Sequence, residues 1–121
     1  MTLSIAAITL DCRNAADLGA FWSAVFEQPL DAEPAPNQFF ASIGRSPEST
    51  STGPTMMFIA VPEAKTAKNR MHLDLQADDR EAEVARLVDL GATVVHDKDE
   101  WETRWTTLTD PEGNEFCVAK H

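Results

Sequence analysis

The side chains best suited to acid–base chemistry lie in the run Asn69 to Gln76. His72 and Asp74 are two residues apart, so in an extended strand both point to the same face. An imidazole titrates near neutral pH, and with a carboxylate beside it His72 is a candidate general acid or base. The alternative is that the two side chains only hydrogen-bond to each other. Both residues are therefore candidate catalytic residues, and His72 is also a candidate ligand contact.

A second pair of candidates lies near the C-terminus, where Glu115 and Cys117 share one face of an expected strand. Cys117 is either a nucleophile, which needs a base such as His72, or a small packing residue, which is the commoner case. Imidazole and thiolate both suit zinc or copper, so a soft metal held by His72 and Cys117 is an alternative. Metal centres with Lewis-acid function use three or more protein ligands, and this pair supplies only two. We therefore expect no metal and no other cofactor.

Aromatic side chains offer a surface for a flat ligand. Trp101 and Trp105 are four residues apart on an expected strand and share a face, where they form either an aromatic wall or part of the core. Trp22 lies on an expected helix, at its edge or in the core. The candidate ligand contacts are Trp22, Ile59, His72, Trp101, Trp105, Glu115 and Cys117.

Composition narrows the class of protein. The chain has 121 residues, 43% of them hydrophobic, which suits one domain with a modest core or two small half-cores. Acidic residues outnumber basic ones 20 to 10, and the formal charge of −10 disfavours nucleic acid as a partner. No apolar run is long enough to cross a membrane, and the start does not resemble a secretion signal. Two cysteines without C-x-x-C spacing fit a reducing compartment, so we expect a soluble cytoplasmic protein.

Hydrophobic spacing predicts the elements of the first half. Alternating residues in 5–12 predict a strand with Cys12 on its packed face. The three- and four-residue spacing of apolar side chains after Asn14 predicts a helix that Asn14 caps and Pro29 ends. We expect further strands at 37–44 and 55–61, with a surface loop at 45–54 between them.

The second half repeats this order. A strand over 70–76 precedes a helix that starts at Asp78 or Asp79 and ends at Gly91. Strands over 92–95 and 104–109 follow, and a tight turn at 110–114 leads into a last strand over 115–119.

The two halves align with a shift of 64 or 65 residues, as expected for an internal duplication. We therefore predict an α+β fold in which two strand–helix–three-strand (βαβββ) modules, at about 3–62 and 70–120, make one domain over 1–121. Each module would form a curved four-stranded antiparallel sheet with its helix on the convex side. The polar faces would line a concave cup.

Several motifs resemble those of one family. They are Phe21-Trp22, Asn69-Arg70-Met71-His72-Leu73-Asp74-Leu75, Leu90-Gly91-Ala92 and Asp110-Pro111-Glu112-Gly113-Asn114-Glu115-Phe116-Cys117. With the duplicated plan, these motifs resemble the glyoxalase-like branch of the vicinal oxygen chelate superfamily, which includes glyoxalases, bleomycin-resistance proteins and dioxygenases. The likeness spans nearly the whole chain.

The resemblance implies four metal-ligand positions facing the cup. His72 matches one of them, whereas Ala7, Ile59 and Cys117 stand at the others, where the metal enzymes mostly carry His, Glu or Gln. We therefore expect a homodimeric member that binds a small, largely apolar or aromatic molecule without the usual divalent metal. The alternative is a glyoxalase-like lyase or isomerase that uses His72 as general acid or base. A protein-interaction module with a vestigial cup is a third possibility.

Overall fold

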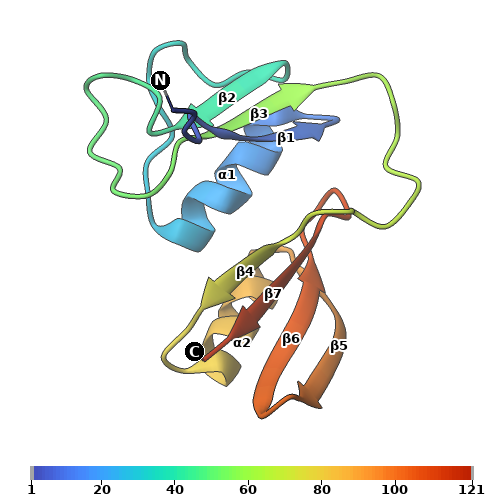
Figure 1. Cartoon of the computed structure of the whole chain (residues 1–121). Helices are drawn as coiled ribbons and strands as arrows, with labels where there is room; N and C mark the ends of the chain where they lie inside the picture. Colours follow the sequence, from blue (N-terminus) through green and yellow to red (C-terminus); the bar gives the residue numbers. More distant parts are fainter. Residues whose placement is uncertain (1, 121) are drawn as a thin grey trace. The chain divides into compact units, whose positions relative to one another are not determined.

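The computed structural model describes residues 2–120 and divides the chain into two compact units, residues 1–64 and 65–121. Each unit has one helix beside one sheet, as Figure 1 shows. The first unit contains β1 (Ile8–Cys12), α1 (Ala15–Phe26), β2 (Phe40–Ile43) and β3 (Met56–Ala60). The second contains β4 (Leu73–Gln76), α2 (Arg80–Leu90), β5 (Thr93–Glu100), β6 (Thr103–Thr109) and β7 (Glu115–Ala119). The predicted α+β class, with two helices and two curved sheets, is confirmed.

The first sheet has the order β1-β3-β2, with β1 parallel and β2 antiparallel to β3. The prediction of four antiparallel strands was therefore wrong for this unit, which has three strands in its described part. Where the second unit forms β5 straight after its helix, the first carries Pro29, Pro34 and Pro36. Proline has no N–H to donate, so this stretch cannot form a strand inside a sheet.

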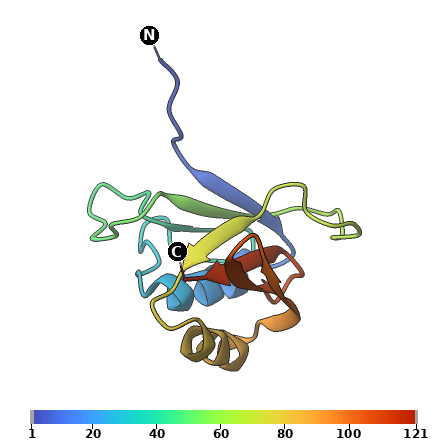
Figure 2. The ribbon, with the colours of Figure 1, turned by 60° about the horizontal axis from the view of Figure 1, so that its bottom comes forward.

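Strand β1 starts at Ile8 and not at Ile5, because the parallel ladder with β3 begins at the pair Ile8–Met56. Residues 2–7 have no place in this ladder, and Figure 2 shows them leading away from β1 as an extended tail. Leu3 and Ile5 are accordingly exposed.

Helix α1 packs on β2 and β3 through one apolar side. Its predicted cap is confirmed, since the Asn14 side chain accepts a hydrogen bond from the Asp17 backbone N–H at 3.0 Å. Close packing favours a glycine at position 19, because a Cβ there would lie 3.1 Å from the Ala41 Cβ and 3.3 Å from a ring carbon of Phe58, closer than ordinary van der Waals contact. The helix side chains in the core are Leu18, Phe21, Trp22 and Val25.

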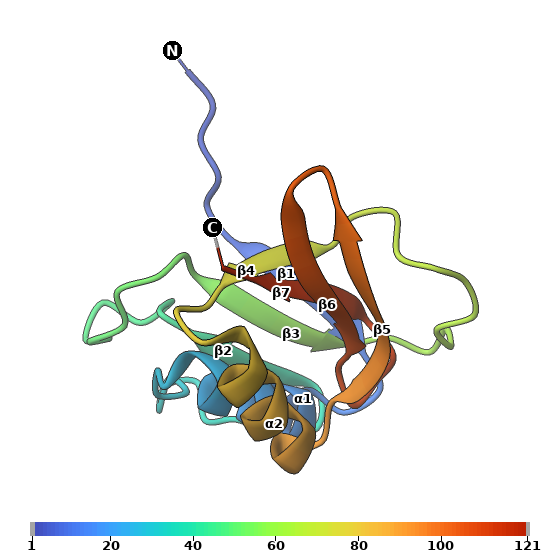
Figure 3. The ribbon, with the colours of Figure 1, turned by 90° about the horizontal axis from the view of Figure 1, so that it is seen from below.

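The second sheet has the predicted four strands, in the order β4-β7-β6-β5. The prediction that all its pairs are antiparallel is wrong, because β4 runs parallel to β7, whereas the other pairs are antiparallel. Helix α2 begins after its cap Asp79, ends at Gly91 as predicted, and packs on β6 and β7. Figure 3 shows the long β5–β6 hairpin of this unit. Its tip extends past β7, because β7 pairs only with residues 105–109 of β6. No helix in the described part of the chain is long and apolar enough to span a membrane.

A buried carboxylate, Asp31, holds the start of the surface loop at 45–54. It is 5% exposed and accepts hydrogen bonds from the Ser42 hydroxyl at 2.7 Å and from the backbone N–H groups of Arg45 and Ser46 at 2.8 and 3.3 Å. Burial alone would raise the pKa of Asp31. The hydrogen bonds from Ser42 and from the loop backbone have a larger, opposite effect, so the pKa lies below its usual 3.8.

We predict that Asp31→Asn lowers the free energy of unfolding at pH 7 by about 1–3 kcal/mol, because the donors that bond one carboxylate oxygen would face a neutral amide oxygen, a weaker acceptor. Urea denaturation followed by circular dichroism measures this change. Since folding lowers the pKa of Asp31, its contribution is present above pH 3.8 and is lost as the pH falls through the folded-state pKa.

The difference in the free energy of unfolding between wild type and Asp31→Asn should therefore become smaller below pH 3.8. Glu63→Gln, at an exposed position, is the matched control and should leave the free energy of unfolding unchanged. A variant as stable as wild type at pH 7 would contradict this role of Asp31.

Candidate functional site

The second sheet carries polar side chains on the face that α2 does not cover. In the ladders, Asp74 of β4 lies opposite Cys117 of β7, Cys117 lies opposite Thr107 of β6, and Thr107 lies opposite His96 of β5. Partners opposite each other in a ladder point to the same face. We call this face, with the row Asp74, Cys117, Thr107 and His96, the polar sheet face.

His72, Asp74 and Cys117 come together at one end of this row. The His72 Nε2 atom lies 3.4 Å from the Asp74 Oδ1 atom, and the potential donor atoms of all three residues lie within 4.8 Å of one another. The His72 and Asp74 side chains are 41% and 63% exposed, so molecules in solution can reach them. Cys117 is half-buried. We call these three residues the His–Asp–Cys cluster.

Thr107 holds the thiol of this cluster from the other side. Its hydroxyl oxygen lies 3.3 Å from the Cys117 sulfur, and Thr107 is 9% exposed. The sequence did signal this contact: the turn at 110–114 makes β6 and β7 neighbours and sets 109 opposite 115, so 107 must lie opposite 117. Thr107 is a site residue that motif analysis alone missed.

Two tryptophans stack at the tip of the β5–β6 hairpin. The ring centroids of Trp101 and Trp105 are 5.9 Å apart and the ring planes differ by 13°. Trp101 is 84% exposed, whereas Trp105 is half-buried. The two rings lie side by side, as expected, but Trp101 lies in the turn between β5 and β6 and not on a strand.

The turn at this tip has an unusual backbone. Trp101 and Glu102 have φ angles of 51° and 62°, the positive pair of a two-residue type I′ hairpin turn. Asn and Gly normally occupy such positions, because larger side chains are strained there by about 1–3 kcal/mol. The fold thus holds a large exposed ring in a costly conformation, where it stacks on Trp105.

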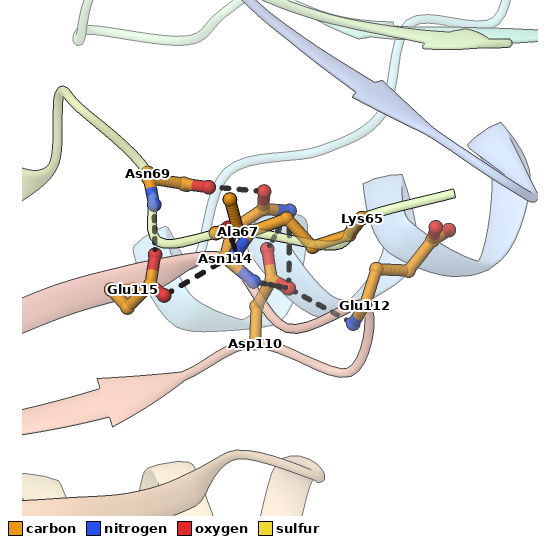
Figure 4. A network of polar contacts seen from close by, with 7 residues as sticks. All are labelled: Lys65, Ala67, Asn69, Asp110, Glu112, Asn114 and Glu115. Carbon is orange, nitrogen blue, oxygen red and sulfur yellow. Dashed lines mark hydrogen bonds and ion pairs between the residues drawn. The ribbon is translucent and has the colours of Figure 1, made fainter. Parts of the chain in front are cut away.

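Glu115 has a structural role that differs from the predicted ligand contact. Its carboxylate accepts hydrogen bonds from the Asn69 backbone N–H at 2.9 Å and from the Lys65 ammonium at 3.3 Å, and Lys65 also donates to the Ala67 carbonyl. Figure 4 shows this network, which binds the chain ahead of β4 to the start of β7. Burial alone would raise the pKa of Glu115. The hydrogen bonds from the backbone and from Lys65 have a larger, opposite effect, so the pKa lies below its usual value.

The neighbouring turn is built on Asp110. Its carboxylate accepts hydrogen bonds from the backbone N–H groups of Glu112 and Asn114 at 2.9 and 3.0 Å, and Gly113 takes a φ of 91°. The Asn114 side chain also accepts from the Asn69 amide at 3.2 Å. The turn therefore sets the β6–β7 register and helps to place the chain that carries His72.

The remaining predicted contacts lie in the first unit. Trp22 is 1% exposed and packs against Phe21 and Phe26 at centroid distances of 5.4 and 5.6 Å, so the expectation of a ligand contact is corrected to a core residue. Ile59 is half-buried on the face of its sheet that α1 does not cover, and its ligand role stays a prediction. Cys12 is 4% exposed and packs in the core, as expected.

Comparisons with known proteins find one family model and several solved structures of similar fold. A model of the glyoxalase-like domain family matches residues 7–119. No curated protein sequence matches the chain. A glyoxalase/bleomycin resistance protein/dioxygenase family enzyme from Burkholderia phytofirmans PsJN is 17% identical with a TM-score of 0.72, over 98% of each chain.

Two further solved structures have a similar fold. A glyoxalase-related enzyme from Fulvimarina pelagi is 16% identical with a TM-score of 0.72, over 99% of this chain and 89% of that one. A fosfomycin resistance protein from Mesorhizobium loti is 14% identical with a TM-score of 0.71, over 100% of this chain and 94% of that one. At such identities the likeness of each solved structure shows the fold alone.

We predict that Glu115→Ala lowers the free energy of unfolding by about 1–3 kcal/mol, because the Asn69 N–H loses its acceptor. The variant should also release the segment 65–70, so that trypsin cuts after Lys65, Lys68 or Arg70 several times faster than in wild type. Mass spectrometry of timed digests locates the cuts.

Glu63→Ala is the control, since Glu63 lies at an exposed position just before this segment. Unchanged cleavage of the Glu115 variant in 65–70 would show that this carboxylate does not hold the segment.

Proposed function

The chain belongs to the glyoxalase-like domain family of the vicinal oxygen chelate superfamily, and from this premise we propose that it binds a small, largely apolar or aromatic molecule. The contact surface is the polar sheet face together with the stacked Trp101–Trp105 pair. The observation that carries the proposal is this pair, since a strained turn presents a ring that is 84% exposed.

An exposed indole stacked on a second indole suits a planar guest. The free face of Trp101 can take a further ring, and such ring pairs contribute about 0.5–1.5 kcal/mol beyond the burial of their area. Burial of apolar surface adds roughly 25 cal/mol per Å². Structure-forming contacts within the hairpin explain Trp105, but they do not require a large exposed ring at Trp101.

Charge favours a cationic guest at the hairpin tip. Asp99, Glu100 and Glu102 flank the tryptophans, against the cations Lys98 and Arg104. A fourth acid, Asp97, is held by hydrogen bonds from Thr106 and by Arg80 at 3.2 Å. The hydrogen bond from Thr106 is the main cause of its lowered pKa. Acidic residues outnumber basic ones at the tip, so it attracts planar cations more than planar anions.

The residues present do not fit the four-ligand metal set that the resemblance implies. Ile59 offers only a hydrocarbon side chain on β3, and Ala7, directly before β1, offers a methyl group. The donors that remain, His72 and Cys117, both belong to the second unit. The proposed binding function therefore uses no step through that metal.

We predict that 9-aminoacridine, a planar aromatic cation, binds the full chain and quenches its tryptophan emission. Trp101→Ala and Trp105→Ala should each weaken binding about tenfold, the loss of roughly 1.4 kcal/mol of stacking and burial. Isothermal calorimetry measures the affinity independently of the emission change.

Phe39→Ala is the matched control, because Phe39 is an exposed aromatic residue of the first unit, 66% accessible. Its affinity should equal that of wild type. If both tryptophan variants bind 9-aminoacridine as tightly as wild type does, the aromatic wall is not part of the binding site.

A second candidate function rests on the His72–Asp74 contact of 3.4 Å. In a lyase or isomerase, the neutral His72 imidazole would take a proton from a carbon next to a carbonyl, and the Asp74 carboxylate would stabilise the imidazolium that forms. The developing oxyanion needs a donor, and Gln76 carries an amide N–H₂ two residues beyond Asp74 on the same face.

We predict for this second function that the chain catalyses exchange of the carbon-bound protons of hydroxyacetone with deuterium from D₂O. His72→Ala and His72→Gln should each slow the exchange at least about 100-fold, the usual contribution of a general base. Proton NMR follows the exchange, and circular dichroism confirms the fold.

His96→Ala is the control, since His96 lies in the same row of the polar sheet face. Exchange at the wild-type rate in both His72 variants would exclude His72 as the base.

The proposal also includes a homodimer in the cytoplasm. Sedimentation equilibrium tests the dimer.

A further inference from the structure

The side chain of Arg80 connects helix α2 to the β5–β6 hairpin. Its Nη1 atom lies 3.2 Å from the Asp97 carboxylate of β5 and also donates to the Thr106 hydroxyl of β6, which in turn donates to Asp97. The Arg80 side chain is 11% exposed, and Thr106 is 1% exposed. One largely buried guanidinium therefore binds both strands of the hairpin.

The helix itself does not explain a cation at this position. Arg80 is the first residue of α2, directly after the cap Asp79. The N-terminus of a helix carries a partial positive charge, which favours acidic side chains and disfavours a guanidinium. Glu81 lies 3.8 Å from the guanidinium but its side chain is 81% exposed, so this ion pair contributes little. The partners on the hairpin therefore explain the arginine better than the helix does.

Strand β5 is held mainly by polar contacts. It is an edge strand, and all eight of its residues are exposed. Helix α2 packs on β6 and β7, so burial of apolar side chains contributes little to the attachment of β5. The pairing of β6 with β7 ends at the pair Trp105–Ala119, and the tip of the hairpin extends past it. The contact between Asp97 and Arg80 thus holds the hairpin close to the point where support from β7 ends.

The residues that Arg80 binds are next to the tryptophan pair in the hairpin. Thr106 directly follows Trp105, and neighbours in a strand point to opposite faces of the sheet. Arg80 therefore holds β6 from the helix side at the place where Trp105 points to the polar sheet face. Asp97 lies opposite Thr106 in the ladder, on the strand that leads into the turn with Trp101.

We propose that Arg80 is the positioning residue of the Trp101–Trp105 pair. Its contacts with Asp97 and Thr106 fix the hairpin below the tip, so the two rings stay stacked and Trp101 stays available to a guest. The effect on ligand affinity rests on the proposed binding function. The effect on the stack is a property of the chain alone.

The test reads the two rings by NMR in the full chain without ligand. Stacked indoles shift each other's ring protons upfield, and wild type should show this shift for the signals that Trp101→Phe and Trp105→Phe each remove. Arg80→Met should lose most of the shift. The methyl signals of Leu108 and Val118, in the core of the same unit, should keep their positions. Unchanged core signals separate a loss of positioning from a loss of the fold.

Variants of the partners show whether Arg80 acts through them. Asp97→Ala and Thr106→Val should each lose part of the shift, and Arg80→Met combined with Asp97→Ala should lose no more than Arg80→Met alone. Arg80→Lys keeps the charge but not the planar guanidinium, so it should retain part of the shift. If Arg80→Met does not fold, Arg80→Lys and Thr106→Val carry the same test.

Calorimetry with 9-aminoacridine measures the effect on binding separately. Arg80→Met should bind it several-fold more weakly than wild type, by at most the factor of about ten expected for removal of one ring. If wild type does not bind 9-aminoacridine, the proposed function fails, whereas the ring-proton shifts of the free chain still decide the role of Arg80.

Two controls match the change in charge. Arg45→Met removes a guanidinium that lies over the Phe40 ring in the first unit, and Glu81→Gln alters the exposed neighbour of Arg80. Both should keep the wild-type shifts of the tryptophan signals. The proposal is overturned if wild type shows no upfield shift, if folded Arg80→Met keeps the full shift, or if Arg45→Met loses as much of it as Arg80→Met does.

Discussion

The register of β7 between its two neighbours is the constraint on which the candidate site depends. β7 runs parallel to β4 and antiparallel to β6, so a single residue, Cys117, is opposite Asp74 on one side and Thr107 on the other. A shift of one residue would turn Cys117 to the helix side and bring Phe116 or Val118 to the polar sheet face. Burial of these two side chains at 1% and 2% exposure therefore stabilises the register, and with it the position of the thiol.

Polar contacts at the end of β7 strengthen the same constraint. The Asp110 carboxylate closes the turn between β6 and β7, and Glu115 binds the chain that leads into β4. Both acids accept backbone N–H groups, which can adopt only the positions that the chain path allows. The residues that look reactive in the sequence thus divide into two groups. Glu115 and Asp110 build the frame, and the frame leaves His72, Asp74 and Cys117 accessible at its edge.

Local signals in the sequence predicted most of the fold. Residue type suffices to find features that depend on contacts between residues near in sequence. They are the helix caps at Asn14 and Asp79, the end of α2 at Gly91 and the turn at 110–114.

Four features could not be found in this way, because they depend on other forces. The prolines after α1 removed a strand, the full burial of Trp22 followed from packing, and the role of Glu115 came from a partner 46 residues away. The turn at Trp101 was missed because tryptophan and glutamate are not the usual residues of positive-φ turns.

The two surfaces of the second unit differ in what maintains them. The cluster of His72, Asp74 and Cys117 follows from strand register, and a sheet of this register places three donors together whatever the hairpin does. The tryptophan pair follows from a strained turn, whose cost the protein bears without gaining burial for Trp101, which is 84% exposed. The stack on Trp105 leaves most of the Trp101 ring exposed, and a bound aromatic partner would bury the rest. The proposed organic ligand therefore depends on the hairpin tip, and the second candidate function depends on the cluster.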